Sequence, residues 1–389
     1  MTAFKQLGIQ HSLEEKLKEQ HITVPTTIQS KSIPHLLAGK DLIGQAETGS
    51  GKTLAFLLPI LQNLKTDLSQ VQAIVVAPTR ELAKQIWEEA VKLNDGSLQM
   101  LAVYGGQDVE RQIKKLQSFP QLVVGTPGRI LDHLRRETLD LSGVHTLVLD
   151  EADQMLHIGF LNEVKQIIAA VPETRQTVLF SATLTPAVKA LAASYTEKAV
   201  DVSDTKTHLN VKEIKQRYLQ VTDRAKQGTL CKIIDEYRPY LAVVFCRTKR
   251  RAQKLNDELK GLGYNCDALH GDLSQSQRER VMARFKKAEL QILVATDVAA
   301  RGIDVEGVTH VINYDIPQDA DSYIHRIGRT GRAGSSGLAI TFTGPRDQGY
   351  LDDIKRAIDA PIQKIEIQFA ENKPKREDNK PSFKKRKRN

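Results

Sequence analysis

The sequence predicts an α/β protein of two domains, each built on a mostly parallel sheet flanked by helices. Short runs rich in β-branched residues alternate with helical patterns along the chain, which is typical of parallel sheets. The length of 389 residues exceeds one ordinary hydrophobic core and fits two domains with short extensions. A polar stretch at 203–212, SDTKTHLNVK, separates two similar groups of strands.

The strands expected in the first half are Asp41–Gln45, Ala73–Ala77, Met100–Tyr104, Leu122–Val124, Thr146–Leu149 and Thr177–Phe180. Those expected in the second half are Tyr218–Val221, Ala242–Phe245, Cys266–Leu269, Ile292–Ala295, His310–Asn313 and Ala339–Phe342. We therefore expect an N-terminal domain at 1–202, a linker at 203–213, a C-terminal domain at 214–368 and a disordered basic tail at 369–389.

The composition is that of a soluble globular protein, with 40% hydrophobic and 26% charged residues. We expect no signal peptide, because Met1–Gly8 contains no apolar run. The longest apolar run, Leu54–Leu61, is too short to span a bilayer. The three cysteines lack the paired spacing of a disulfide framework or a zinc site, so we expect a cytoplasmic protein.

The net charge of +9 is concentrated at the C-terminus, where residues 371–389 hold nine Lys/Arg and three Asp/Glu, a net charge of +6. Such a composition cannot form a core, so this segment is expected to be disordered. We interpret it as a tether that binds an anionic partner through salt-sensitive contacts. A solubilising end and a nuclear localisation signal are the alternatives.

Two helices are expected before the first strand. The apolar spacing of Ser12–Gln20 predicts a short helix, with Ser12 as its N-cap and Glu15 completing a capping box. Pro25 biases the preceding residue away from helix, so a second helix should begin at about Thr26.

The stretch AETGSGKT at 46–53 lies between an expected strand and a helical pattern. Glycines let backbone N–H groups turn toward an anion, and the N-terminus of the following helix adds its dipole. Lys52 can reach the β- and γ-phosphates, and Thr53 can ligate Mg²⁺. This order of strand, loop and helix predicts a nucleotide site, although Ala46 stands where the motif usually has its first glycine. A plain tight turn is the alternative.

The stretch VLDEAD at 148–153 is an apolar strand that ends on two adjacent acids, followed by a third. An unpaired buried carboxylate is costly, so such acids must be paired, hydrated or bound to metal. Beside a phosphate loop, Asp150 can hold the Mg²⁺ shell and Glu151 can orient or deprotonate the attacking water. Asp153 is expected to organise other residues. A strand that runs out into solvent is the alternative.

Several other strand ends in the first half carry small, hydroxyl or basic residues. The carboxyl ends of parallel strands form one rim, and backbone N–H groups with an arginine there suit a sugar-phosphate chain without reading its bases. Arg80 and Arg129 could instead be surface salt-bridge residues. The stretches concerned are PTREL at 78–82, GG at 105–106, TPGR at 126–129 and SAT at 181–183.

The second half has no phosphate loop, so we expect it to close over nucleotide bound to the first half. HRIGRTGR at 325–332 sets three arginines among glycines, and an arginine directed at a γ-phosphate accelerates transfer by about 10³–10⁵. Asp304, in RGID at 301–304, could bind a ribose hydroxyl. A solvated basic turn and an exposed turn aspartate are the alternatives.

Taken together, these motifs resemble those of the DEAD-box RNA helicases of superfamily 2. The matches run from Phe4 to Arg332, in family order and at family spacing: PTTIQ, AETGSGKT, PTREL, GG, TPGR, DEAD, SAT, VFCRT, HGD, QSQR, ATDVAARGID and HRIGRTGR. One departure is His21-Ile22, where the family often has Gly-Phe or Gly-Tyr. The resemblance implies two RecA-like domains, with ATP and Mg²⁺ as cofactors.

The resemblance also implies roles for individual residues. In the nucleotide site, Gln29 would contact adenine, Phe4 would stack on the base and Asp304 would bind the ribose. Phosphates and Mg²⁺ would be held by Thr48, Gly49, Ser50, Gly51, Lys52 and Thr53, with Asp150 on the metal, Glu151 activating water, and Arg329 and Arg332 as arginine fingers. Coupling of hydrolysis to domain closure would involve Asp153, Ser181, Thr183 and His325. RNA contacts would come from Pro78, Arg80, Gly106, Thr126 and Arg129, and across the cleft from Gly271, Arg278 and Thr296.

The implied function is an RNA-stimulated ATPase that separates RNA strands locally rather than by processive tracking. We expect a monomer that contacts RNA largely through its backbone and has no membrane partner. An ATP-gated RNA clamp and a DNA translocase are the competing functions.

Overall fold

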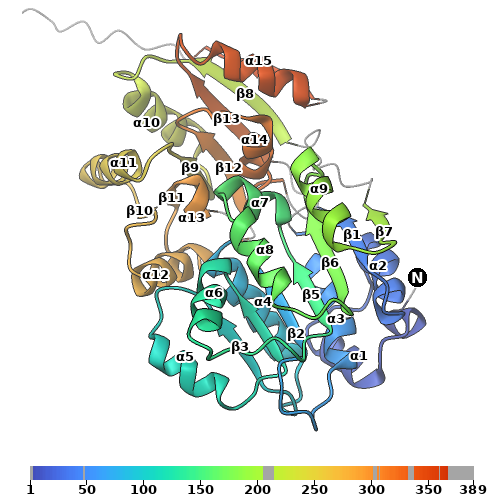
Figure 1. Ribbon diagram of the computed structural model, residues 1–389. Helices are drawn as coiled ribbons and strands as arrows, with labels where there is room; N and C mark the ends of the chain where they lie inside the picture. Colours follow the sequence, from blue (N-terminus) through green and yellow to red (C-terminus); the bar gives the residue numbers. More distant parts are fainter. Residues whose placement is uncertain are drawn as a thin grey trace, which may run out of the picture.

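The computed structural model describes residues 3–46, 49–204, 214–300, 305, 307–331, 337–358 and 360–366. Within these residues the chain forms two seven-stranded sheets, one in each half. Figure 1 shows the two sheets with their helices as two bodies in contact, the first half coloured blue to green and the second yellow to red.

The first sheet has the strand order β3-β4-β2-β5-β6-β1-β7, and all of its pairings are parallel. Its strands are β1 Leu42–Gln45, β2 Ala73–Val76, β3 Met100–Val103, β4 Leu122–Gly125, β5 Thr146–Leu149, β6 Gln176–Ser181 and β7 Val200–Ser203. The helices of this half are η1 Phe4–Leu7, α1 His11–Glu19, α2 Thr27–Leu37, α3 Lys52–Asn63, α4 Arg80–Leu93, α5 Val109–Leu116, α6 Pro127–Arg135, α7 Ala152–Ile158, α8 Leu161–Ala169 and α9 Pro186–Tyr195.

The second sheet repeats this topology, in the order β10-β11-β9-β12-β13-β8-β14 and again with parallel pairings. Its strands are β8 Ile214–Gln220, β9 Leu241–Phe245, β10 Cys266–Leu269, β11 Ile292–Ala295, β12 Val308–Asn313, β13 Gly337–Thr343 and β14 Ile362–Lys364. The helices are α10 Lys226–Tyr237, α11 Lys249–Gly261, α12 Gln275–Lys286, α13 Asp297–Ala300, α14 Ala320–Ile327 and α15 Gln348–Ala357. The two halves therefore share one fold.

Burial of both sheet faces explains why the central strands read as continuous apolar runs. In β2, Ala73 and Val75 pack into the hydrophobic cluster on one face, while Ile74 and Val76 pack into the cluster on the other. Successive side chains of a strand point to opposite faces, so a strand covered on both sides must be apolar throughout. The helices that cover these faces leave the carboxyl ends of the strands free to form the site.

The predicted α/β fold and each predicted strand are confirmed. The two strands that the sequence did not predict, β7 and β14, lie at sheet edges and are short and partly polar, so their apolar pattern is weak. β8 begins at Ile214, earlier than predicted. The expected linker falls mainly on residues outside those described, as does the basic tail.

The expected cap of the first helix is wrong, whereas the expected start of the second helix is confirmed. α1 begins at His11 after Gln10, and no side chain caps it, so Ser12 lies inside the helix and not at its N-cap. α2 begins after Thr26, whose side chain accepts from the backbone N–H of Gln29 while Gln29 reaches back to the backbone N–H of Thr26. This capping box fixes the start of α2 beside the phosphate loop.

No helix in the described ranges combines the length and the apolar character needed to cross a membrane. Within the same ranges, no group of three or more His, Cys, Asp or Glu residues is arranged to hold a metal ion.

Candidate active site and nucleic-acid interface

The glycine-rich loop lies between β1 and α3, as the sequence predicted. Gly49 has φ 86° and Gly51 has φ 91°, a left-handed region that residues with a Cβ rarely adopt. Gly51 is the N-cap of α3, which begins at Lys52. The loop thus ends at a helix N-terminus, which favours an anion. Glu47 and the predicted phosphate ligand Thr48 lie outside the described residues.

Gln29 joins α2 to this loop. Its Nε2 donates to the carbonyl oxygen of Gly51 at 3.0 Å, and the side chain is 2% exposed. A Cβ at Gly51 would lie 2.5 Å from that nitrogen, so the close approach requires glycine. Phe4, which was expected to stack on a base, is 1% exposed and packs within the core of the first half. The structure therefore places Gln29 at the loop and the Phe4 ring in the core.

Lys52, at the start of α3, and Asp150, directly after β5, are both buried. Nζ of Lys52 donates to the carbonyl oxygen of Ala46 at 2.9 Å. Burial raises the pKa of Asp150 to about 6, and the neighbouring Glu151 acts in the same direction, whereas the charge of Lys52 opposes the rise. The charge of a buried carboxylate that is only partly offset by a neighbouring lysine would be stabilised by a bound cation, so Asp150 suits the role of a metal ligand. Thr53, in the first turn of α3, offers a hydroxyl of the kind that completes such a site.

Glu151 occupies a strained turn between β5 and α7. It has φ 51° and ψ 53°, is the N-cap of α7, and is 3% exposed. A residue other than glycine in this region costs of order 1–3 kcal/mol and persists only where the surroundings hold it. Asp150 follows β5 directly, whereas Glu151 opens α7, so the two adjacent acids are placed by different elements.

Asp153 joins three segments. Its Oδ2 accepts from the backbone N–H of Thr183 at 2.9 Å and from the Thr183 hydroxyl at 3.0 Å. Its backbone N–H donates to Oγ of Ser181 at 3.3 Å, and that hydroxyl donates to the carbonyl oxygen of Thr183. Nε2 of His325, from the second half, lies 3.5 Å from Oδ2. The four residues that were expected to couple the domains are therefore in contact.

The arginines of the 325–332 stretch differ in their surroundings. Arg326 is 3% exposed and forms a bidentate ion pair with Asp297, while its Nη1 donates to the carbonyl oxygen of Asp315. It therefore supports the second half internally. Arg329 is 4% exposed, and its Nε donates to the carbonyl oxygen of His325 at 3.2 Å. Arg332 and Asp304 lie outside the described residues.

Three of the four predicted rim stretches, PTREL, GG and TPGR, line one cavity of about 540 Å³, whereas the fourth, SAT at 181–183, does not. The cavity lies at the strand ends of the first half and reaches the second half, where HGD and α12 contribute to its wall. Gly106 belongs to the same rim, because a Cβ there would lie 2.5 Å from Nη1 of Arg80 and 3.2 Å from Cβ of Gln275. Thr296, after β11, does not line it. Of the predicted RNA contacts, those that line the cavity are Pro78, Arg80, Thr126, Arg129, Gly271 and Arg278.

Two ion pairs cross from α4 to α12 beside this cavity, and the sequence did not predict them. Nε of Arg278 lies 2.9 Å from Oε1 of Glu81, and both side chains are largely buried. Nζ of Lys84 lies 3.3 Å from Oε1 of Glu279, and both are substantially exposed. Their charges in PTREL and QSQR are visible in the sequence, but their pairing depends on how the two halves meet.

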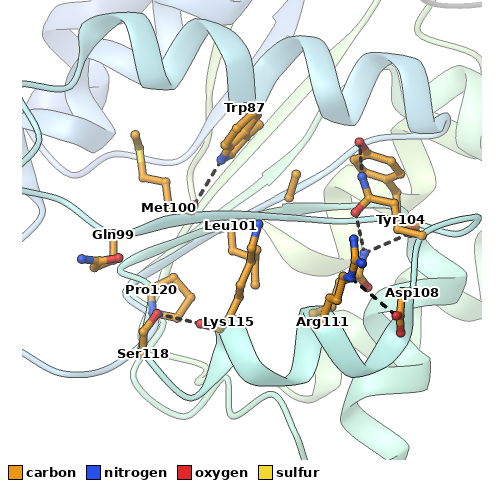
Figure 2. Close-up of a pocket in the computed structure, with 13 residues that line it drawn as sticks. Trp87, Gln99, Met100, Leu101, Tyr104, Asp108, Arg111, Lys115, Ser118 and Pro120 are labelled. Atoms are coloured by element: carbon orange, nitrogen blue, oxygen red, sulfur yellow. Dashed lines mark hydrogen bonds and ion pairs between the residues drawn. The ribbon is translucent and has the colours of Figure 1, made fainter. Parts of the chain in front are cut away.

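A second cavity, of about 580 Å³, follows the edge strand β3 between α4 and α5. Figure 2 shows Trp87 above the strand, Arg111 and Lys115 on the opposite side, and Tyr104 at one end of the cavity. Nε1 of Trp87 donates to the carbonyl oxygen of Met100 at 3.1 Å, which occupies one acceptor of the strand edge. No sequence motif marks this cavity.

Family models match both halves of the chain. The model described as "DEAD/DEAH box helicase" matches residues 26–191, and the one described as "Helicase conserved C-terminal domain" matches residues 225–334. A curated relative, the DEAD-box ATP-dependent RNA helicase CshA of Bacillus cereus, is 48% identical over 92% of this chain and 68% of its own length. The ATP-dependent RNA helicase CshA of Limosilactobacillus reuteri is 48% identical over 91% of this chain and 71% of its own.

Solved structures match over both halves at once. S. cerevisiae Dbp5 bound to RNA and ADP BeF3 is 32% identical, with a TM-score of 0.84 over 94% of this chain and 96% of its own. Mss116p bound to ssRNA and AMP-PNP is 31% identical, with a TM-score of 0.84 over 94% of this chain and 80% of its own. A DEAD box protein from Methanococcus jannaschii is more identical, at 39%, yet has a TM-score of only 0.54. The two halves here are therefore arranged as in the structures with RNA and nucleotide.

Proposed function

Because the chain belongs to the DEAD-box family of ATP-dependent RNA helicases, we propose that it separates RNA strands locally, without processive tracking, and remodels RNA–protein complexes. It is an ATPase and a helicase with two RecA-like halves. We assign residues 1–202 to the ATP-binding domain, 203–213 to a linker, 214–368 to the second domain and 369–389 to a basic tail. We further propose that it acts as a cytoplasmic monomer.

The observation that carries the proposal is the buried contact between Asp153 and His325. Asp153 follows the two acids of the ATP site by only a few residues, and its hydrogen bonds reach Thr183. A change at the ATP site can therefore alter a contact on which the closed arrangement of the two halves depends. This is the physical requirement for coupling nucleotide to RNA binding, since each ligand must favour one arrangement over the other.

In the proposed ATP site, the backbone of Gly49, Ser50 and Gly51 and the side chain of Lys52 hold the phosphates. Thr53 and Asp150 hold Mg²⁺, which when bound offsets the charge of the β- and γ-phosphates. Glu151 orients the attacking water and accepts its proton. Arg329 and Arg332 stabilise charge that develops on the γ-phosphate.

At the base end of the site, Gln29 is proposed to recognise adenine, with Phe4 beside it and Asp304 on the ribose. The capping box and the contact with Gly51 support the role of Gln29, because they bring adenine recognition and phosphate binding onto one rigid unit. The buried position of the Phe4 ring means that stacking on adenine would require a local rearrangement.

RNA is proposed to lie along the rim cavity. Arg80 and Arg129 supply positive charge from the first half, and Pro78, Gly106 and Thr126 allow close approach of the backbone. Gly271, Arg278 and Thr296 extend the surface onto the second half. Because these groups suit phosphate and sugar, the contacts position RNA without reading its sequence. Closure brings the two surfaces together and bends the bound strand, and hydrolysis returns the open state.

The test is Glu151→Gln, with Glu173→Gln, an exposed glutamate of the first half, as the matched control. Loss of a general base lowers the rate by about 10²–10⁴. RNA-stimulated hydrolysis and duplex separation should fall by that factor, while RNA should still bind in the presence of ATP. Full RNA-stimulated ATP hydrolysis by Glu151→Gln would contradict the proposal that Glu151 activates the attacking water. Retention of RNA without unwinding by the unaltered protein would favour the RNA clamp.

A further inference from the structure

One buried amide on α5, that of Gln112, contacts two of the three first-half segments at the RNA rim, the loop after β3 and the start of α6. The side chain is 2% exposed. Its Nε2 donates to the carbonyl oxygen of Tyr104 at 3.2 Å and to Oε1 of Gln107 at 3.1 Å. Its Oε1 accepts from Nη1 of Arg129 at 2.8 Å. The loop after β3 and the first turn of α6 are thus joined through a single side chain.

The partners of this amide fix its orientation. Arginine only donates and a carbonyl oxygen only accepts, so the amide oxygen must face Arg129 and the nitrogen must face Tyr104. Nε2 of His133 lies 3.0 Å from the same amide oxygen and must therefore carry a hydrogen. Nδ1 of His133 lies 2.9 Å from the hydroxyl of Thr138, and the ring is fully buried.

The protonation of His133 agrees with this arrangement. Burial lowers its pKa, and the nearby charge of Arg129 lowers it further, while Asp132 opposes the shift. A neutral ring with hydrogen on Nε2 can donate to Gln112 and accept from Thr138. The amide is therefore held from the interior side by the buried ring of His133.

The shortest hydrogen bond of the Arg129 guanidinium is the one to Oε1 of Gln112. The Arg129 side chain is only 12% exposed, and its Nε lies 4.0 Å from Oδ2 of Asp132. Both Nη atoms lie 3.4 Å from the carbonyl oxygen of Gln107. Without the amide oxygen, the nearby carboxylate of Asp132 becomes the strongest competing acceptor. The guanidinium would then turn toward Asp132 and away from the loop that carries Gly105 and Gly106.

The same residues form the wall between the two cavities of this half. Arg129 lines the cavity at the rim, whereas Gln107 and Gln112 line the cavity along β3, one end of which is marked by Tyr104 in Figure 2. The amide is therefore out of reach of an RNA strand in the rim cavity. Any effect of Gln112 on RNA must pass through Arg129 or the loop.

We propose that Gln112, oriented by His133, is a positioning residue that holds Arg129 and the Tyr104–Gln107 loop in the arrangement that binds RNA. The proposal rests on the RNA contact assigned above to Arg129. It concerns affinity for RNA and not the chemistry of ATP, because Gln112 contacts none of the ATP-site residues described.

The test is a double-mutant cycle in the full chain, using Gln112→Met, Arg129→Ala and the pair together. Gln117→Met, an exposed glutamine just after the same helix, is the matched control. The readouts are the RNA concentration that half-saturates ATP hydrolysis, the rate at saturating RNA, and the thermal unfolding temperature. A second variant, Gln112→Glu, keeps an acceptor facing Arg129 but cannot donate to Tyr104.

Loss of a hydrogen bond to a charged group should raise half-saturating RNA about tenfold in Gln112→Met. The rate of ATP hydrolysis at saturating RNA should change little. The double variant should need the same RNA concentration for half-saturation as Arg129→Ala alone. Gln112→Glu should lose less affinity than Gln112→Met, because the acceptor is retained. Gln117→Met should match the unaltered protein.

Three outcomes would overturn the proposal. The first is an unchanged half-saturating RNA concentration in Gln112→Met, and the second is a double variant whose loss of affinity is the product of the two single losses. The third is an equal loss of affinity in Gln112→Met and Gln112→Glu. Equal losses in the two variants would indicate that Gln112 contributes only packing. This comparison remains informative even if Gln112→Met unfolds at a lower temperature than the unaltered protein. If Arg129→Ala itself had no effect on RNA, the RNA contact assigned to Arg129 would be wrong as well. That result separates failure of the proposed function from failure of the role of Gln112.

Discussion

Oδ2 of Asp153 lies 3.5 Å from Nε2 of His325 across the boundary between the two halves, and both side chains are less than one-tenth exposed. Burial alone would raise the pKa of Asp153, but the proximity of His325 and the N–H of Thr183 outweigh it and lower the pKa. The carboxylate therefore stays charged near neutral pH. The carbonyl oxygen of His325 also accepts from Nε of Arg329, so one set of contacts runs from Thr183 to the arginine segment.

Replacing Asp153 by Asn should uncouple RNA from ATP hydrolysis. The side chain keeps its shape but loses the charge that faces His325, so the closed arrangement loses a contact that the separated halves do not make. Coupling between two ligands typically changes affinity by a factor of about 5–150. The factor by which RNA stimulates ATP hydrolysis should decrease by an amount in that range. ATP hydrolysis with and without RNA measures it. The exposed Asp201→Asn serves as control and should keep full stimulation.

The two ion pairs between α4 and α12 should differ in their importance. Glu81 and Arg278 are 15% and 10% exposed, so removing one charge leaves the other poorly solvated. Lys84 and Glu279 are 35% and 40% exposed, and such surface pairs contribute about 0–1 kcal/mol. Glu81→Gln should therefore weaken RNA binding in the presence of an ATP analogue about tenfold or more, and Glu279→Gln about fivefold at most. Equal effects would show that burial does not set the strength of this interface.

Much of the fold followed from the sequence because parallel strands buried on both faces must be apolar throughout, as in β2, β4 and β5. The edge strands β7 and β14 were missed because only part of each is buried. The ATP-site residues were predictable because their spacing is local. The roles of Arg326, Gln112 and His133 were not, since each depends on partners distant in the sequence. Glu151 could not be recognised as strained, because no residue pattern specifies its φ.

Removing residues 371–389 should weaken RNA binding mainly at low salt. The segment carries a net charge of +6, and each phosphate contact it makes would steepen the dependence of affinity on salt. Fluorescence anisotropy with a single-stranded RNA at several salt concentrations measures the change. A version with the nine Lys/Arg changed to Gln keeps the length of the segment and should behave like the deletion. Unchanged affinity at low salt would contradict the tether.

The thiols should be slow to alkylate in the folded protein. Burial raises the pKa of Cys266 to about 11 and raises the pKa of Cys246 further, while Cys231, partly exposed, is raised less. The reactive thiolate is therefore scarce at pH 8, and labelling should accelerate as pH rises. Mass spectrometry of iodoacetamide-treated protein should find Cys231 modified first. Early modification of Cys246 would contradict its position in the core of the second half.

Two substitutions of Gln29 can distinguish its contact with Thr26 from its contact with Gly51. Its Oε1 accepts from the N–H of Thr26 in the capping box, and its Nε2 donates to Gly51 in the phosphate loop. Gln29→Glu keeps an acceptor for the cap but cannot donate to Gly51, whereas Gln29→Ala loses both. Loss of the hydrogen bond from the N–H of Thr26 costs about 0.5–1.5 kcal/mol of stability, so only Gln29→Ala should unfold at a lower temperature. Both variants should bind a fluorescent ATP analogue about tenfold more weakly, because the loop loses the same restraint in each. Normal ATP affinity in Gln29→Glu would show that the contact with Gly51 does not organise the loop.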